Sequence, residues 1–417
     1  MVARPTPGRE RRETMATLLD LAGCAAACGG AALAAYWSFG LARIARTVRT
    51  LPTPRDGVAL ARASPPGASV CVIVPAHNER AVIAGLIATL RAQDHPNLRV
   101  VLALDRCTDG TEEVARGAIG GDPRFAVVRI DECPAGWSGK VHAAYRGVHD
   151  GDALNSDYIL FADADTLFDP RLVSASVALA SSRGLDFMSL VSTLTHGRWF
   201  ERAAQPAAGL ELMRQYPLLR ANLREGRRAF ANGQFMMFTR DAYVRCGQHW
   251  EVRGELLEDI RFARVAEYFG MTSGVYLADG MLVCRMYHSW AEFRRGWKRI
   301  YTEAANRRAG RLLGLARRTR AVDSLLPMIA LAAVVLGALG AGGDLRPAVI
   351  LAGAAGLIAW TLAMLWVVRL GHGPWWTAWL MPVGSWLVGG IMREAARDLR
   401  AGRPTEWAGM TYARDVR

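Results

Sequence analysis

The sequence predicts an α/β domain with a mostly parallel sheet, accompanied by apolar helices towards both ends of the chain. Two observations lead to this prediction. Short runs rich in Val, Ile, Leu and Phe alternate with segments of helical periodicity between residues 70 and 161, and this alternation is typical of a parallel sheet covered by helices. Long apolar stretches lie outside that region, some of them near the ~20 residues that a helix needs to cross a bilayer.

The predicted elements follow one another in a regular order. Strands are expected at 70–74, 99–104, 125–130 and 157–161, with helices at 81–93 and 111–118. In a parallel sheet the carboxyl ends of the strands meet at one edge, where ligands bind. The residues directly after each strand are therefore the first candidates for a functional site.

Polar clusters follow three of these strands. They read Pro75-Ala76-His77-Asn78-Glu79, Asp105-Arg106-Cys107-Thr108-Asp109-Gly110-Thr111 and Asp163-Ala164-Asp165. Each cluster alone has a plainer explanation: an Asp-Gly-Thr sequence is common at a turn before a helix, and two aspartates one residue apart occur often by chance. Three such clusters at three strand ends indicate one shared site.

The pair Asp163 and Asp165 indicates a divalent cation. Carboxylate oxygens suit a hard ion such as magnesium or manganese, which keeps several waters and binds substrate phosphates. Such an ion neutralises charge that develops on a diphosphate leaving group. Asp163 is also explained as a turn residue, but the pair together favours a metal site.

Lys140 is one of only two lysines among 51 basic residues, the other being Lys298. It ends the sequence Gly136-Trp137-Ser138-Gly139-Lys140, where a compact charge beside glycines is able to approach phosphate oxygens. The spacing of a phosphate-binding P-loop is absent, and a solvated surface lysine is the alternative. A lysine in a chain that otherwise uses arginine favours a specific role.

Glu258 and Asp259 open the helical run 260–269 and form the next candidate group. Acidic residues stabilise a helix N-terminus on electrostatic grounds alone, which is the structural explanation. The functional explanation is a general base, which must lie within hydrogen-bond reach of the attacking group.

Four apolar segments are candidates for membrane helices: 15–41, 325–339, 347–368 and 374–392. The first contains Asp20 and follows a basic tail, so a cleaved signal peptide is its alternative, but its length and the arginines after it favour an uncleaved anchor. The fourth carries four tryptophans, and because tryptophan prefers the membrane interface, this segment either spans or lies among the headgroups. Buried helices of a soluble protein are the alternative for all four segments. The tryptophans are Trp375, Trp376, Trp379 and Trp386.

The net charge of +13 is concentrated before the second apolar segment. Residues 294–320 contain ten basic residues and one acid, a charge of +9 (10 − 1). Basic segments next to membrane helices favour the cytoplasmic side and anionic lipids. A nucleic-acid partner is not expected, because no recognition module is visible. The seven cysteines form no CxxC pair, so neither a disulfide framework nor a structural zinc site is indicated.

In this order, the motifs resemble the family-2 inverting glycosyltransferases with a GT-A fold. The resemblance runs from about residue 68 to 300 and rests on the three polar clusters, on Gly139-Lys140, on Gly233-Gln234-Phe235 and on Glu258-Asp259. The flanking anchors look like the membrane-bound subgroup that acts on lipids, which includes ceramide glucosyltransferases and the carotenoid-pathway and hopanoid-associated glycosyltransferases. The stretch 134–140 looks most like the last two groups, which are bacterial.

The resemblance implies a role for each matching residue. One set shapes the nucleotide pocket, with Asp105 near the base; it comprises Pro75, Asn78, Glu79 and Asp105. Lys140 matches a residue close to the donor, and Asp163 with Asp165 matches the metal and diphosphate motif. Asp259, beside Glu258, matches the catalytic base that deprotonates the acceptor hydroxyl as it attacks the anomeric carbon.

The chain departs from the family pattern in two places. The second cluster supplies a single aspartate, Asp105, where the family often has a pair, so base recognition is expected to differ. The Q-x-x-R-W motif of processive members is replaced by residues 294–299. Trp297 is then expected to cap the acceptor site and Arg294 or Arg299 to contact the diphosphate, with a membrane-surface helix as the alternative for this piece.

The expected protein is a membrane-bound, hexosyltransferase-like enzyme. It moves a sugar from a nucleotide diphosphate, expected to be UDP, to a lipid-like acceptor hydroxyl (polyisoprenoid, hopanoid, carotenoid or glycolipid), with magnesium or manganese. A polysaccharide synthase is the alternative, which the altered motif disfavours; a catalytically silent membrane scaffold is a further one. The expected location is the inner (cytoplasmic) membrane, multi-pass, with the catalytic domain in the cytoplasm.

The expected divisions of the chain follow from these segments. In order they are a basic tail (1–14), an anchor helix (15–42), a linker (43–67), the GT-A domain (68–290), a basic amphipathic segment (291–321), two or three membrane helices (322–392) and a polar tail (393–417).

Overall fold

The computed structural model describes residues 7–224, 226–403, 405–407 and 410–412. The basic tail at 1–14 and the polar tail at 393–417 therefore lie partly outside the described residues. The chain forms two compact units. The sheet unit comprises residues 49–195, 212–307 and 402–417, and the helical unit comprises residues 1–48, 196–211 and 308–401.

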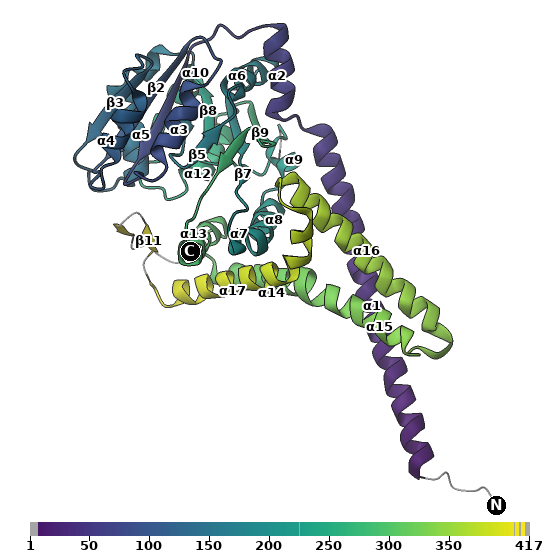
Figure 1. Ribbon diagram of the computed structural model, residues 1–417. Helices are drawn as coiled ribbons and strands as arrows, with labels where there is room; N and C mark the ends of the chain where they lie inside the picture. Colours follow the sequence, from purple (N-terminus) through teal and green to yellow (C-terminus); the bar gives the residue numbers. More distant parts are fainter. Residues whose placement is uncertain (1–6, 225, 404, 408–409, 413–417) are drawn as a thin grey trace, which may run out of the picture. The chain divides into compact units, whose positions relative to one another are not determined.

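A seven-stranded, mostly parallel sheet forms the centre of the sheet unit (Figure 1). Its strands, in spatial order, are β3 (Phe125–Ile130), β2 (Leu98–Asp105), β1 (Val70–Ala76), β4 (Tyr158–Ala162), β8 (Phe235–Thr239), β6 (Phe187–Val191) and β9 (Ser273–Leu277). Only β8 runs antiparallel to its neighbours in this sheet. The strands expected at 70–74, 99–104, 125–130 and 157–161 are β1 to β4, which confirms the predicted α/β class.

Helices cover both faces of this sheet, which explains why its strands read as continuous apolar runs. Val72 and Val74 of β1 belong to a core with Leu86 and Leu172, whereas Ile73 belongs to a second core with residues of other helices, Val141 and Phe262 among them. The helices of this unit are α2 (Pro54–Ala63), α3 (Ile83–Arg91), α4 (Thr111–Ile119), α5 (Gly139–Asp150), α6 (Leu172–Ser182), α9 (Leu218–Ala221), α10 (Arg240–Arg245), α11 (Gln248–Glu251), α12 (Glu258–Tyr268) and α13 (Trp290–Ala304), with a short 3₁₀ helix at Ala153–Asn155. The helices expected at 81–93 and 111–118 are α3 and α4.

A small second sheet has the order β5-β10-β7, with β5 at Thr166–Phe168, β10 at Leu282–Cys284 and β7 at Thr193–Leu194. Cys284 pairs with Thr166 across this sheet. The pairing brings β10 beside the loop that follows β4. The strands β11 (Thr405–Trp407) and β12 (Met410–Tyr412) form a separate hairpin.

The residues expected as a linker, 43–67, are largely helical instead. Most of them belong to the end of a long first helix, α1 (Pro7–Thr50), and to α2, which begins with Pro54 and is capped by Asp56 accepting a hydrogen bond from the backbone N–H of Thr53 at 2.8 Å. Proline at the first helical position and this cap are typical helix-start signals. Gly57 lets α2 approach α6 closely, because a Cβ there would lie 2.2 Å from the carbonyl oxygen of Ala175.

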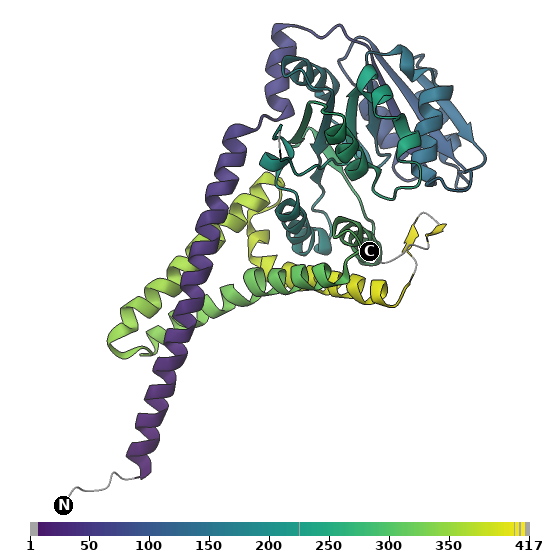
Figure 2. The same ribbon diagram turned by 180° about the vertical axis from the view of Figure 1, so that it is seen from behind.

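The helical unit contains most of α1, together with a helical hairpin that both views show (Figures 1 and 2). The hairpin consists of α15 (Leu326–Ala338) and α16 (Arg346–Leu370). The remaining elements are α7 (Trp199–Ala203), α8 (Gln205–Gln215), α14 (Ala309–Arg320), a π-helical turn (Ala321–Leu325), 3₁₀ helices at Gly343–Leu345 and Trp375–Leu380, and α17 (Met381–Arg400). The basic segment expected at 291–321 is thus α13 in the sheet unit and α14 in the helical unit.

Three helical stretches are long and apolar enough to cross a membrane: Thr14–Ala63, Ala309–Ala338 and Gly343–Leu370. Their apolar side chains are widely exposed, as at Leu331 (54%) and Leu351 (68%). Side chains of this kind favour a lipid surrounding over the buried-helix alternative, and they indicate membrane association. Within the described residues, the fourth apolar run at 374–392 is not among the candidates; α17 buries Gly384 and Val388 and exposes Trp386.

Small residues join α1 to the hairpin. A Cβ at Gly30 would lie 2.7 Å from the carbonyl oxygen of Ala352, so the two backbones are in direct contact, as is common where membrane helices cross. Asp20, the one charge in the first apolar segment, accepts a hydrogen bond of 2.6 Å from the backbone N–H of Gly342, between α15 and α16. This hydrogen bond gives the carboxylate a partner at the hairpin turn.

Candidate active site

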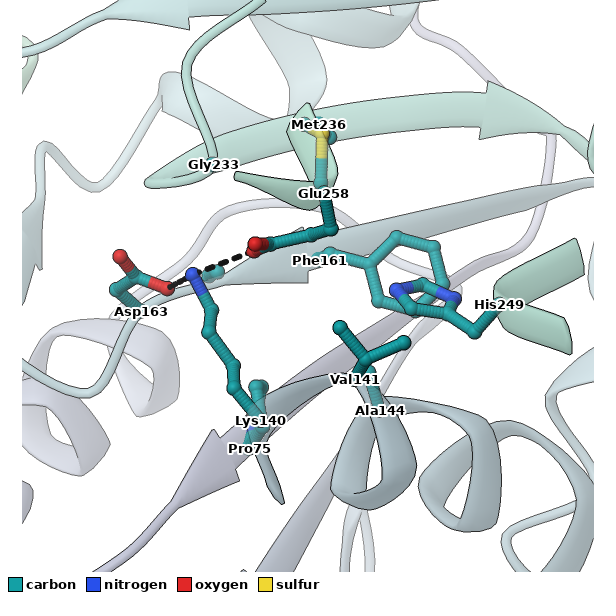
Figure 3. A pocket seen from close by; sticks show the side chains of 11 residues that line it. Pro75, Lys140, Val141, Ala144, Phe161, Asp163, Gly233, Met236, His249 and Glu258 are labelled. Carbon is teal, nitrogen blue, oxygen red and sulfur yellow. Dashed lines mark ion pairs between the residues drawn. The ribbon is translucent and has the colours of Figure 1, made fainter. Parts of the chain in front are cut away.

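The candidate site lies where β1 and β4 end and where α5 and α12 begin. A pocket there is lined by Pro75, Lys140, Val141, Ala144, Phe161, Ala162, Asp163, Gly233, Met236, His249 and Glu258 (Figure 3). Residues of five predicted motifs therefore meet in one place, at the carboxyl ends of the strands where ligands bind in parallel sheets. The pocket is almost filled by side chains, since only about 10 Å³ remains, about the space of one water.

Lys140 lies between two carboxylates in this pocket (Figure 3). Its Nζ is 2.6 Å from Asp163 Oδ1 and 2.8 Å from Glu258 Oε1. Burial alone lowers the pKa of Lys140, but the charges of Asp163 and Glu258 outweigh burial and raise the pKa above its ordinary value. The ammonium therefore stays charged, and the structure places it in the pocket and not on the solvated surface.

Asp163 and Asp165 lie in the turn between β4 and β5. Burial, and then the charge of Asp163, raise the pKa of Asp165 to about 7. Burial likewise raises the pKa of Asp163, against the opposing charge of Lys140. Asp165 Oδ1 is buried without a hydrogen-bond partner in the described part of the chain. This local excess of negative charge, with one carboxylate oxygen unused, fits a divalent cation.

The side chains that the structure describes are too few to enclose such a cation. Among the described residues no group of three His, Cys, Asp or Glu side chains is placed to hold a metal ion. Magnesium and manganese are usually bound by one or two carboxylates of the protein, while water and substrate phosphates fill the other coordination positions. The pair Asp163 and Asp165 fits that pattern.

Glu258 and Asp259 are the first two residues of α12, but their surroundings differ. Burial raises the pKa of Glu258, yet the charge of Lys140 outweighs it and lowers the pKa below its ordinary value. Burial, and then the charge of Glu258, raise the pKa of Asp259 to about 7. Glu258 is therefore a permanent partner of Lys140, whereas Asp259 exchanges a proton near neutral pH, as a general base requires.

Backbone groups hold Asp259 in place. Its Oδ2 accepts a hydrogen bond of 2.9 Å from the N–H of Gly233, and its Oδ1 accepts one of 2.7 Å from the N–H of Ile260. A Cβ at Gly233 would lie 3.2 Å from both Glu258 Oε1 and Lys140 Nζ. A larger residue at this position would therefore crowd the ion pair, a role that the motif Gly233-Gln234-Phe235 did not reveal in the sequence.

The residues after β1 join its loop to the loop after β2. Asn78, in a left-handed conformation at φ 57°, accepts a hydrogen bond of 2.8 Å from the N–H of Thr108. The N–H of Glu79 donates to Thr111 Oγ1 at 2.8 Å. Burial, and then the charges of Asp165 and Asp163, raise the pKa of Glu79 to about 8. Glu79 therefore belongs to the same acidic group as the metal candidates.

Asp105 is buried and already paired. Arg106 donates to both of its carboxylate oxygens, from Nε to Oδ1 at 2.9 Å and from Nη2 to Oδ2 at 2.7 Å. A Cβ at Gly139 would lie 2.9 Å from Arg106 Nη2, which places this ion pair at the start of α5. No role was predicted for Arg106 from the sequence. Its position directly after Asp105 was the one signal for this ion pair.

The three α13 candidates are placed differently from one another. Trp297 is 2% exposed and packs between Phe293 and Tyr301. Burial raises the pKa of Asp163, and the charge of Arg299 is one of the smaller influences that oppose this rise. Arg294 is exposed, and none of the three lines the pocket around Lys140.

Sequence reasoning also missed His249. It lines the pocket from α11, and burial lowers its pKa to about 3, so the ring is neutral. The hydroxyl of Tyr243 is 2.7 Å from its Nδ1. No local sequence pattern identifies His249, because its place depends on the packing of α11 against α5.

Comparison with known structures gives distant neighbours. A mannosyltransferase from Pyrobaculum calidifontis, in complex with GDP-Man and Mn²⁺, is 17% identical, with 92% of this chain and 98% of that chain covered and a TM-score of 0.45. S. aureus TarS residues 1–349 with UDP-GlcNAc is 16% identical, with 83% and 96% covered and a TM-score of 0.38. Glucosyl-3-phosphoglycerate synthase from Mycobacterium tuberculosis, with Mn²⁺, UDP and phosphoglyceric acid, is 20% identical, with 61% and 82% covered and a TM-score of 0.39. No curated protein matches the chain.

The family described as glycosyltransferase like family 2 matches residues 65–295, more than half of the chain. The matched range contains β1 to β10 and every candidate residue on them and on their loops. Together with the mostly parallel sheet, this match confirms the predicted GT-A fold and the resemblance drawn from the motifs. The chain belongs to the family-2 glycosyltransferases.

Proposed function

We propose that the protein is a membrane-bound, inverting glycosyltransferase that transfers a sugar from a UDP-linked donor to the hydroxyl of a lipid-like acceptor. The observation that carries the proposal is the meeting of Asp259, Glu258, Lys140 and Asp163 at one edge of the sheet. The family match supports the reaction class. The apolar helices support the membrane and the lipid acceptor.

Asp259 is the proposed catalytic base. Near neutral pH a substantial share of this carboxyl group is ionised, so it is able to accept the proton of an acceptor hydroxyl. As the oxygen–hydrogen bond breaks, the acceptor oxygen forms its bond to the anomeric carbon from the face opposite the diphosphate. The bond between the anomeric carbon and the diphosphate oxygen breaks, the electron pair leaves with the diphosphate, and the configuration inverts.

Lys140 and the acidic pair are proposed to hold the diphosphate end of the donor. Asp163 and Asp165 would hold magnesium or manganese, which supplies positive charge to the leaving diphosphate. Lys140 offers three N–H donors and pairs with two carboxylates, so one donor remains for a phosphate oxygen. Pro75, Asn78, Glu79 and Asp105 are proposed to line the nucleotide side, with Arg106 beside Asp105.

The α13 residues keep the roles that the resemblance implies, as proposals. The charge of Arg299 reaches the carboxyl group of Asp163, which supports a position of Arg299 near the diphosphate. Arg294 is proposed as the alternative contact. Trp297 is proposed to support the acceptor side from within the core. The acceptor is proposed to be a polyisoprenoid, hopanoid, carotenoid or glycolipid, reached from the inner membrane, with the sheet unit in the cytoplasm and the chain crossing the bilayer more than once.

The test is transfer of a labelled sugar in membranes that contain the full chain. Asp259→Asn and Asp165→Ala are expected to abolish transfer with the fold intact, while Asp241→Asn, which removes an exposed carboxylate from the first turn of α10, is expected to be active. Mass spectrometry of lipid extracts with and without the protein identifies the acceptor. Full activity in both site variants would exclude the proposal, and long polymers in place of glycolipids would favour a polysaccharide synthase.

A further inference from the structure

A second cavity in the sheet unit is separate from the candidate active site. We call it the arginine cavity; it has a volume of about 240 Å³ and is lined by Glu255, Leu257, Ile260, Arg261, Arg264, Glu303, Asn306 and Arg307. It shares no lining residue with the pocket around Lys140. Its volume far exceeds the ~10–15 Å³ that one enclosed water needs, so the cavity has room for a ligand of several atoms.

Cationic side chains dominate the polar wall of this cavity. Three guanidinium groups face two carboxylates there. Arg307 is held by Glu303 through hydrogen bonds of 3.0 and 2.9 Å, and its side chain is only 11% exposed. Arg264 Nη2 donates to Asn306 Oδ1 at 3.2 Å. Each guanidinium has five N–H donors, so these contacts leave donors for an anion, and the planar fork suits phosphate oxygens.

The backbone at the end of α13 supports the same interpretation. Asn306 and Arg307 both have left-handed conformations, with φ of 53° and 54°. Asparagine tolerates this region, but for arginine it is unfavourable, because Cβ approaches the following carbonyl oxygen. Residues held at such a cost occur preferentially at ligand sites. Here the two strained residues are adjacent, and both line the arginine cavity.

The cavity also reaches the helix that carries the candidate base. Leu257, Arg261 and Arg264 recur at helical spacing along one side of α12. Asp259 precedes Arg261 by two positions, which places it on roughly the opposite side of the same helix. A ligand in the cavity would thus contact α12 within one turn of Asp259, without entering the active site.

We propose that the arginine cavity binds the phosphate group of a second ligand, with Arg264 and Arg307 as its main contacts and Leu257 and Ile260 as an apolar wall. The phosphate belongs either to a free phosphorylated metabolite or to a lipid headgroup. This site is additional to the donor site and does not depend on which sugar or acceptor the enzyme uses.

The test is equilibrium binding of radiolabelled inorganic phosphate to the full chain in phosphatidylcholine nanodiscs, with a chelator present so that no metal recruits phosphate to the active site. Wild type is expected to bind one phosphate saturably. Arg264→Gln and Arg307→Gln are each expected to weaken binding about tenfold or more. Arg308→Gln is the matched control, because Arg308 is the exposed neighbour of Arg307 and does not line the cavity.

Arg264→Gln keeps the test decisive if Arg307→Gln fails to fold. Arg264 is exposed, and its substitution removes a hydrogen bond to Asn306. A second arm repeats the measurement in nanodiscs that contain phosphatidylglycerol. Displacement of labelled phosphate by this lipid supports the site with a headgroup as its ligand, and undiminished binding supports the site with a free phosphate. Absence of saturable binding in wild type, or equal binding by wild type and both variants, would overturn the proposal.

Discussion

Lys140 Nζ lies 2.8 Å from Glu258 Oε1, and this ion pair joins the first turn of α5 to the first turn of α12. The same ammonium contacts Asp163, so one lysine links the motif after β4 to the helix that carries Asp259. Because Lys140 holds Glu258 ionised, the two neighbouring carboxyl groups of α12 have opposite pKa shifts. The contact therefore separates a structural carboxylate from a titrating one.

Lys140→Met is expected to destabilise the sheet unit. It leaves Asp163 and Glu258 buried without their cation, and breaking a buried ion pair from one side costs about 3–5 kcal/mol. Thermal unfolding of the purified full chain would measure this loss. Lys298→Met is the matched control, because it removes the only other lysine, which lies outside the pocket. Equal unfolding temperatures for the two variants would contradict the role given to Lys140.

The rate of sugar transfer is expected to rise with pH and to level off above about pH 7. Asp259 must lose its proton before it accepts one from the acceptor, and its pKa is raised to about 7 by burial and by Glu258. The check is a profile of kcat/KM against pH with saturating metal, measured in membranes. A rate that does not change between about pH 5 and 8 would show that Asp259 is not the base.

The same carboxyl group makes stability depend on pH in the opposite sense. The folded protein retains the proton of Asp259 up to about pH 7, whereas the unfolded chain loses it near 3.8. The folded state therefore binds more protons in that window, and its stability falls as pH rises from about 4 to 7. Asp259→Asn is expected to remove this part of the dependence, so that the variant gains stability over wild type at pH 8 but not at pH 4. Unfolding curves of wild type and Asp259→Asn at the two pH values measure this effect. The same difference in unfolding free energy at pH 4 and pH 8 would contradict the raised pKa of Asp259.

Gly233→Ala is expected to reduce activity with little effect on expression. The added Cβ would lie 3.2 Å from Lys140 Nζ and Glu258 Oε1, so the ion pair or the Gly233–Asp259 hydrogen bond must shift. A displacement of about 1 Å near reacting groups costs about a hundredfold in rate, and the few tenths of an ångström needed here are expected to cost less. Gly117→Ala is the control, because a Cβ in α4 has open space around it, and there alanine stabilises the helix by about 1 kcal/mol. Comparable activity in the two variants would argue against a close-packed site.

The strands and the place of the site were predictable because both rest on short-range patterns. Runs such as Val70–Val74 are apolar at every position and mostly β-branched, since they are covered on both faces. The residues that follow such runs must lie at one edge of a parallel sheet. The acidic and lysine motifs were identified for the same reason. Three of the four apolar segments were predictable as candidate membrane helices for a similar reason, because a candidate span is recognised by its length and apolar composition alone.

The partners of those residues were not predictable, because they come from distant parts of the chain. Folding brings Lys140 against Glu258, and Gly233 beside both. It also gathers residues 196–211 into the helical unit with the C-terminal helices. The protonation of each carboxyl group depends on such long-range packing, since burial and neighbouring charges set its pKa. The motifs thus name the candidate groups, and the fold sets the protonation of each of them.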